Sequence, residues 1–219
     1  MKEFRERATA LFSWIALFCV LYFPFAAVLL HFIRTDLDPV STVLSMYALG
    51  EAGTLLRVAF LLIGLSEIIL SIRIYIRTGS VSNLGRLLLF IAGVGVCIVA
   101  IDKWGGVHNF GALLQFTSFP IAVLLIGFRQ HKRAERHISI SIGVVTSILL
   151  VLMIITEFGG PFHSKDISGL IQKTDICAIW IWLFLASLRD CRKLNLRQQV
   201  NLVCRQGACV SVFKQSEKK

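Results

Sequence analysis

Six apolar stretches recur along the chain, and polar segments rich in charged residues and glycine separate them. A helix that crosses a hydrocarbon layer of about 30 Å needs roughly 20 mostly apolar residues, and each stretch with its flanks provides them. The pattern therefore predicts an all-α fold, a polytopic membrane bundle of six transmembrane helices. The predicted spans are Ala10–Phe32, Thr54–Ile76, Leu87–Ile101, Phe110–Phe128, Ile138–Thr156 and Ile176–Leu188.

The composition favours lipid as the medium around most of the chain. Of the 219 residues, 56% are hydrophobic and only 16% are charged, whereas soluble domains have about 25% charged residues. We therefore expect a six-helix transmembrane domain over residues 1–188 and a basic cytoplasmic tail over residues 189–219. This length leaves no room for a second globular domain. Membrane lipids are the predicted partners, and the sequence identifies no protein partner.

The distribution of basic residues predicts the orientation. Eighteen of the 23 lysines and arginines lie in the N-terminal segment, the second and fourth loops and the tail. The other five are Arg34, Arg57, Lys103, Lys165 and Lys173. Lysine and arginine in short loops stay in the cytoplasm, so we expect both termini to be cytoplasmic. The net charge of +10 then lies beside anionic headgroups, and nucleic acid is not a predicted partner.

The loops on the predicted outward side combine histidine with acids near helix ends. Asp102, His108 and Ser41 are candidate catalytic residues, because a histidine can activate a serine hydroxyl or bind a catalytic metal together with carboxylates. Further candidates, for ligand binding, are His163, Asp166, Asp38 and Glu67. No local spacing such as HExxH supports a particular reaction, and these acids equally suit helix caps or ion pairs. The cofactor and the presence of a metal stay unknown.

Glu67 differs from the other candidates because it lies inside a predicted span. An ionised side chain there costs at least ~2.5 kcal/mol. Arg57 is ten positions away, about 15 Å along a helix, and is too distant to pair with it. Two interpretations remain: a relay for protons or ions, or a hydrogen bond to a neighbouring helix at Gln115, Thr117 or Ser118.

Three local features refine the predicted helices. The mixed segment Ser41–Gly53 predicts a short interfacial helix or a re-entrant turn. Gly93 and Gly95 in the third span predict close helix packing, because small residues let helix backbones approach each other in lipid. Ser168 can cap the sixth helix, which would then begin well before its apolar core.

Several short motifs of the chain belong together. They are Asp38–Ser41 through Tyr47–Gly50, Phe60–Leu65, Asp102 with His108-Asn109, Phe116 and Pro120, and Gly169–Lys173 leading into Trp180–Leu183. Together these motifs resemble the domain of unknown function 998 family, over about Leu11–Arg189. The resemblance implies a six-helix prokaryotic protein of the inner (plasma) membrane, and it implies no established reaction. The family often has an arginine where this chain has Lys173.

The leading functional hypothesis is an integral membrane protein that binds or handles a lipid or small ligand at an outward-facing polar pocket. One alternative is a membrane-embedded hydrolase, with or without a metal, that uses Asp102 and His108. Another is a proton- or ion-coupled transporter centred on Glu67, and a further one is a structural subunit. The sequence leaves the substrate, the oligomeric state and the question of enzymatic activity open.

Overall fold

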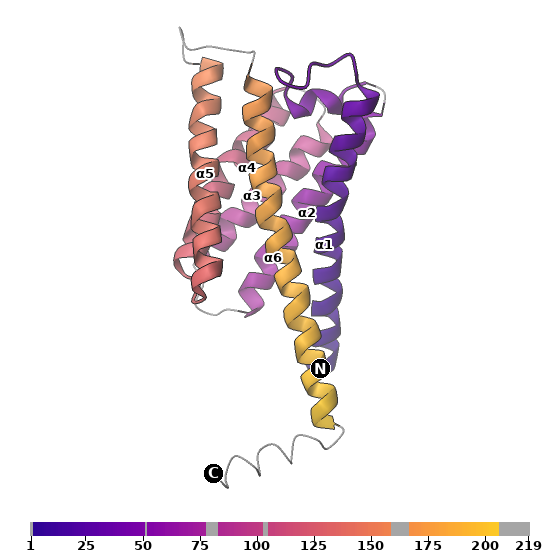
Figure 1. Ribbon diagram of the computed structural model, residues 1–219, viewed down its shortest axis with the longest axis vertical. Helices are drawn as coiled ribbons and strands as arrows, with labels where there is room; N and C mark the ends of the chain where they lie inside the picture. The colour runs from indigo at the N-terminus through magenta and orange to yellow at the C-terminus, as the bar shows by residue number, and fades with distance from the viewer. Residues whose placement is uncertain (1, 51, 78–82, 103–104, 159–166, 206–219) are drawn as a thin grey trace.

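The structure, a computed structural model, describes residues 2–50, 52–77, 83–102, 105–158 and 167–205. Each of its six α-helices contains a stretch long and apolar enough to cross a membrane, which confirms the predicted six-helix membrane fold (Figure 1). The elements are α1 (Lys2–Ile33), the 3-10 helix η1 (Leu44–Ala48), α2 (Gly53–Arg77), α3 (Asn83–Ile101), α4 (Gly106–Phe128), α5 (Arg133–Phe158) and α6 (Ser168–Arg205).

The helices extend beyond the predicted spans. Helix α3 begins at Asn83 and α5 at Arg133, ahead of the apolar positions that marked them. Helix α6 begins at Ser168, which confirms the early start predicted for it, with Ser168 as its first helical residue. Helix α6 also continues past Leu188 to Arg205. A helix satisfies its own backbone hydrogen bonds and can continue from the hydrocarbon layer into the polar headgroup layer. Hydrophobicity therefore marks only the middle of each helix.

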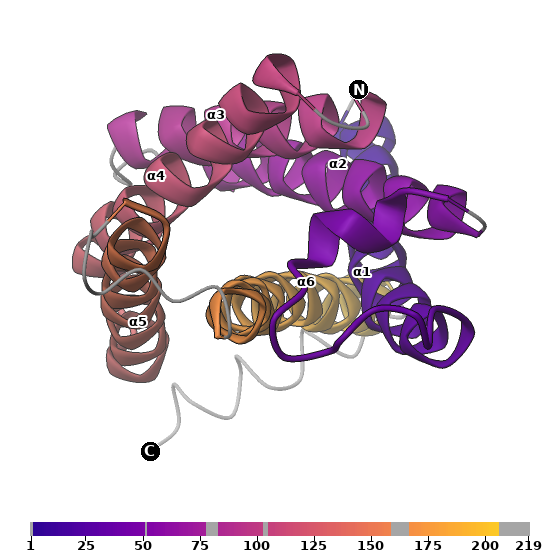
Figure 2. The same ribbon diagram turned by 90° about the horizontal axis from the view of Figure 1, so that it is seen from above.

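The six helices follow one another around a ring. Each helix packs against the next one in the sequence, and α6 closes the ring by contacting α1 as well as α5 (Figure 2). The start of α1 and the end of α6 lie at the same end of the bundle (Figure 1). The first helix therefore begins, and the last helix ends, on the same side of the bundle, while the side of the membrane that this corresponds to stays a prediction.

Glycines bring α2, α3 and α4 into close contact. A Cβ atom added to Gly93 of α3 would lie 2.7 Å from the main-chain oxygen of Gly64 in α2. On the other side of α3, a Cβ atom on Gly95 would lie 2.6 Å from the main-chain oxygen of Gly111 in α4. Both distances are too short for a side chain, so the backbones approach as small residues allow. The packing role predicted for Gly93 and Gly95 is confirmed.

The segment between α1 and α2, residues 34–50, folds onto the end of the bundle opposite the start of α1 (Figure 1). We call it the cap segment. Its short helix η1 contacts α2 and α6, and its residues Leu44, Tyr47 and Ala48 are buried. The predicted short helix is therefore present as a 3-10 helix. It packs into the bundle and closes one end of the ring.

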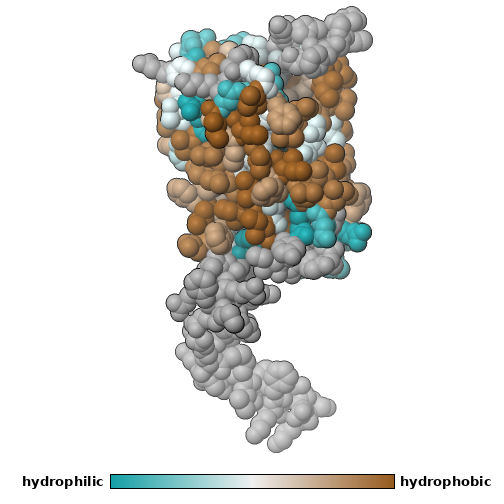
Figure 3. Space-filling model, turned by 180° about the vertical axis from the view of Figure 1, so that it is seen from behind, coloured by the Kyte–Doolittle hydropathy of each residue, from teal (hydrophilic) through white to brown (hydrophobic). Residues whose placement is uncertain are grey.

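The outer surface is suited to lipid. A wide hydrophobic band crosses the middle of the face shown in Figure 3, and hydrophilic residues lie near the two ends of that band. Helix α5 is the most exposed span, with 17% of its apolar stretch buried against 56% for α4. Exposed isoleucine and valine side chains cover α5, which lipid tails solvate without cost. The surface thus agrees with a multi-pass protein surrounded by lipid.

Candidate functional site

A cavity of about 60 Å³ lies inside the ring, next to η1. Every helix except α5 contributes to its wall. The wall is mostly aliphatic and aromatic, and the described lining residues include no lysine, arginine, aspartate or glutamate. Four polar side chains reach it: Ser45 of η1, His108 and Gln115 of α4, and Gln172 of α6.

His108 is held in this wall by Asp102, one of the predicted pair. The Asp102 carboxylate accepts a hydrogen bond of 2.8 Å from the main-chain N–H of His108 and so caps the first turn of α4. The imidazole Nδ1 lies 3.0 Å from the main-chain oxygen of Asp102. A carbonyl oxygen only accepts, so Nδ1 donates. In a catalytic triad the carboxylate itself orients the imidazole, and here it binds the main chain.

Ser41 and Asp38 belong to the cap segment and do not line the cavity. Asp38 accepts main-chain N–H bonds from Val40 at 2.6 Å and from Ser41 at 3.3 Å. These bonds hold the pKa of the Asp38 carboxyl below its usual range. The main-chain oxygen of Ser41 accepts a bond of 3.4 Å from the Ser168 hydroxyl. Asp38 therefore shapes the cap segment, and Ser41 attaches it to α6.

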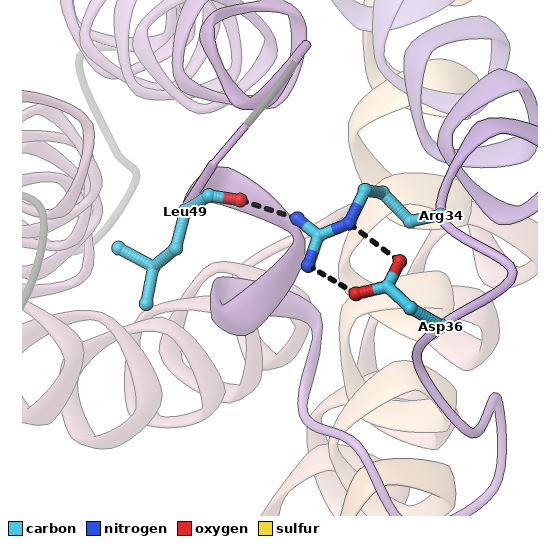
Figure 4. Close-up of polar contacts among 3 residues, drawn as sticks. All are labelled: Arg34, Asp36 and Leu49. Carbon is cyan, nitrogen blue, oxygen red and sulfur yellow. Dashed lines mark hydrogen bonds and ion pairs between the residues drawn. The ribbon is translucent and has the colours of Figure 1, made fainter.

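Arg34, the first residue after α1, joins distant parts of the cap segment. Its guanidinium forms two parallel bonds of 2.8 Å to the Asp36 carboxylate and also donates to the main-chain oxygen of Leu49 (Figure 4). The bidentate contact with Arg34 lowers the pKa of the Asp36 carboxyl. One side chain thus ties the first and last parts of the cap segment together.

Helix α6 holds the cap segment from the other side. The Gln172 side-chain oxygen accepts a bond of 2.7 Å from the main-chain N–H of Leu44. The Lys173 ammonium donates to the main-chain oxygen of Pro39, also at 2.7 Å. Because Gln172 lines the cavity as well, it couples the position of η1 to the cavity wall.

Tyr47 of η1 is enclosed between two basic side chains. Its ring stacks on His31 with centroids 4.6 Å apart, and the Lys173 ammonium lies 4.9 Å from the ring centroid, a distance typical of cation–π contacts. Burial raises the pKa of the Tyr47 phenol. Within the described residues its hydroxyl has no hydrogen-bond partner, which is unusual for a fully buried tyrosine.

Glu67 makes the interhelical hydrogen bond that one interpretation predicted. The Gln115 amide donates a hydrogen bond of 2.9 Å to one oxygen of the fully buried Glu67 carboxyl. The Thr117 hydroxyl instead donates to the main-chain oxygen of Leu113 in its own helix. The second Glu67 oxygen and the Gln115 side-chain oxygen have no partner among the described residues. Since Gln115 also lines the cavity, a single amide separates the Glu67 carboxyl from this space.

Asp175 is a buried acid that the sequence analysis did not single out. It is fully buried in α6, and neither carboxyl oxygen has a hydrogen-bond partner in the described part of the chain. Gln172 lies one turn before it and Ile179 one turn after it, and both line the cavity. The predicted span began at Ile176, one residue after Asp175, which placed this acid in the loop. The early helix start at Ser168 was the available sequence signal, because it puts Asp175 inside α6.

The remaining candidates lie outside the described residues. His163 and Asp166 belong to segment 159–166, of which the structure describes nothing. Among the residues that it does describe, no three histidine, cysteine, aspartate or glutamate side chains are grouped so that they could hold a metal ion.

Comparison with known proteins now adds the family. Residues 17–189 match the model of a family described as protein of unknown function, DUF998. The chain belongs to this family. The match runs from the middle of α1 into α6 and includes every residue that lines the cavity. No curated protein and no solved structure matches the chain. This DUF998 protein is thus an integral membrane protein of a family without an assigned activity.

Proposed function

We propose that this DUF998 protein binds a neutral lipid or small ligand in the cavity beside η1. The observation that carries the proposal is the mostly apolar cavity with the unpartnered Gln115 oxygen in its wall. A buried acceptor without a donor costs about 1–3 kcal/mol, and a ligand hydroxyl or amide would recover that cost. Ligand pockets commonly combine apolar walls with a few convergent polar groups.

The lining restricts the kind of ligand. A charged ligand would need a counter-charge in such an apolar space, and the described lining residues provide none. A volume of about 60 Å³ holds only a few water-sized groups, since a single water occupies at least ~10–15 Å³ on this measure. We therefore propose that the hydroxyl- or amide-bearing end of a larger, lipid-like molecule enters the cavity.

The orientation of this site is part of the proposal. Most lysines and arginines lie in the N-terminal segment, the second and fourth loops and the tail. They favour a cytoplasmic location for the end of the bundle opposite the cap segment. The cap segment and the cavity would then face outward from the inner (plasma) membrane. Reporter fusions after Lys219 should indicate the cytoplasm, and fusions within Gly159–Lys165 should indicate the opposite side. The reverse pattern would overturn the orientation.

Native mass spectrometry of two neighbouring variants tests the binding. Ala112 lines the cavity, whereas Leu113 is 58% exposed on the outer surface of the same helix. Wild type and Leu113→Phe should retain the same co-purified lipid or small molecule, and Ala112→Phe should lose it because the larger ring fills the cavity. Equal retention by all three proteins would contradict binding at this position.

The filling variant has to remain folded for that comparison. Overpacking costs about 1–3 kcal/mol, so thermal unfolding of each variant is measured in the same detergent. If Ala112→Phe unfolds, Ala112→Val makes a smaller intrusion and should reduce the retained ligand without full loss. Unchanged ligand content in a folded Ala112→Val protein would also argue against the site.

Glu67 supports a second candidate function, proton- or ion-coupled transport. The observation that favours it is the Gln115 amide, which connects a fully buried carboxyl to the cavity. In proteoliposomes with an entrapped pH dye, Glu67→Gln should abolish proton flux that the wild type supports. The exposed Asp36→Asn provides a control that removes an acid elsewhere. Absence of wild-type flux, or equal flux in Glu67→Gln, would reject this function.

A further inference from the structure

A second, larger cavity of about 280 Å³ opens between α5 and α6, at the end of the bundle opposite the cap segment. It shares no residue with the cavity beside η1. Its apolar lining includes Trp182 and Leu185 of α6 and Ile138 of α5. Leu185 and Ile138 are also exposed on the outer surface, so this cavity is continuous with the region that lipid tails occupy.

Basic side chains surround the opening. Lys132, Arg189 and Arg192 line it together with a single carboxylate, Glu135. The lining thus has an excess of two positive charges. Basic pockets between transmembrane helices at the cytoplasmic side are typical binding sites for anionic lipid headgroups. The apolar side chains in the same lining would suit an acyl chain.

Arg189 has a hydrogen-bond donor that nothing described here satisfies. Its Nη1 lies 3.1 Å from the Glu135 carboxylate, which accounts for the acid in the lining. Its Nε is buried and has no hydrogen-bond partner among the described residues. A buried guanidinium N–H without an acceptor is costly, and a phosphate oxygen is the acceptor that the planar guanidinium geometry fits best.

Internal hydrogen bonds hold the walls of this cavity in place. The Trp182 indole N–H of α6 donates a hydrogen bond of 3.0 Å to the Ser139 hydroxyl of α5. The Ser139 hydroxyl in turn donates a hydrogen bond of 3.1 Å to the Gln130 side-chain oxygen. These two bonds join α5, α6 and the loop before α5, so the walls of the cavity are preorganised. The Trp182 indole and the Ser139 hydroxyl are thereby already paired.

We propose that this cavity is a binding site for one anionic phospholipid of the adjacent leaflet. The phosphate accepts from the Arg189 Nε, Lys132 and Arg192 neutralise its charge, and an acyl chain follows Trp182, Leu185 and Ile138. The proposal is independent of the ligand proposed for the cavity beside η1. It predicts selection for charge in the headgroup, because a zwitterionic lipid offers no net charge to the two excess cations.

The test uses the full chain in detergent, titrated with dioleoylphosphatidylglycerol or dioleoylphosphatidylcholine and followed by native mass spectrometry. The wild type should retain one phosphatidylglycerol more tightly than any phosphatidylcholine. Lys132→Gln/Arg192→Gln should weaken phosphatidylglycerol binding roughly 30-fold, because each basic residue contributes a factor of slightly more than five and the two factors multiply. Equal affinity for the two lipids would overturn the proposal.

A matched control removes the same charge from the same region. Arg129 and Arg136 are exposed basic residues near this end of α5 that do not line the cavity. Arg129→Gln/Arg136→Gln should retain phosphatidylglycerol binding close to the wild type. If it loses as much affinity as Lys132→Gln/Arg192→Gln, attraction is generic and there is no defined site.

Arg189→Lys tests the guanidinium contact itself. Lysine keeps the charge opposite Glu135 and removes the Nε–H donor. We expect weaker phosphatidylglycerol binding with an unchanged thermal midpoint in lipid-free detergent. Wild-type affinity in Arg189→Lys would contradict the role of the Nε donor, and Arg129→Lys serves as the conservative control outside the cavity.

Discussion

Four acids within the helices have side chains that the structure describes, and the two halves of the bundle hold them differently. The two of them at the end of the bundle where α6 ends pair with arginine. Asp190 of α6 lies 3.0 Å from Arg73 of α2, with both side chains more than nine-tenths buried, and Glu135 of α5 lies 3.1 Å from Arg189 of α6. Nearer the middle and the cap segment, fully buried Glu67 receives only a neutral amide, and fully buried Asp175 has no described hydrogen-bond partner.

This contrast separates structural acids from candidate functional acids. An ion pair joins α2 to α6 and another joins α5 to α6, so these acids fix how the ring closes. Glu67 and Asp175 lack such a partner and lie beside residues that line the cavity next to η1. Buried polar groups without partners are rare in folded proteins, and these two acids lie beside a space that can hold a ligand.

The largest expected effect comes from breaking the buried ion pair. Arg73→Gln leaves the Asp190 carboxylate without its counter-charge, and such changes cost about 3–5 kcal/mol. The free energy of unfolding in mixed micelles, titrated with sodium dodecyl sulfate, measures the loss. The double variant Arg73→Met/Asp190→Leu should lose much less, because it removes both charges. A stable Arg73→Gln single variant would show that the pair does not hold α6 on α2.

An intermediate loss of stability is expected where the backbones of α2, α3 and α4 approach each other closely. The new methyl group of Gly93→Ala meets the main chain of Gly64, so the helices must move apart at a cost of about 1–3 kcal/mol. Gly106→Ala is the control, because a Cβ atom there meets nothing within 4 Å. The same detergent titration compares the two, and equal stability would contradict close packing at Gly93.

Glu67→Gln should change stability by less than about 1 kcal/mol, because the new side-chain oxygen still accepts the Gln115 amide and no ion pair is lost. This result would sharpen the contrast with Arg73→Gln, measured in the same unfolding series. A loss as large as that of Arg73→Gln would mean that Glu67 has a structural partner, and its functional interpretation would fail.

The smallest effect concerns the cap segment, where main-chain N–H groups rather than arginine hold Asp38. Its pKa is lowered in the folded state, so its stabilising contribution is present above the unfolded pKa of about 3.9. That contribution declines as the pH falls through the lower folded value. Amide exchange in the cap segment should be slower in the wild type than in Asp38→Asn at neutral pH. The difference in exchange rate between the two proteins should shrink below pH ~4. A difference that stays constant with pH would contradict a stabilising role for the Asp38 carboxylate.

Sequence reasoning succeeded where the relevant signal is local. Hydrophobic stretches marked six spans because lipid requires about 20 apolar residues in each. Short motifs indicated the DUF998 family, which the match over residues 17–189 confirms. The hydrogen bond between Glu67 and a neighbouring helix was also predictable, since a polar group inside a span needs a partner. Packing at Gly93 and Gly95 followed from the size of the residues alone.

The tertiary structure decided which polar residues meet. Gln172 contacts Leu44 across 128 positions of the chain, and Gln115 contacts Glu67 across 48. The order of helices around the ring brings these residues together, and hydrophobicity along the chain does not encode that order. For the same reason the sequence placed Asp102 beside His108 but did not show that its carboxylate binds the main chain, and it did not single out Asp175. Local composition determines what enters the membrane, and packing between distant segments determines the site.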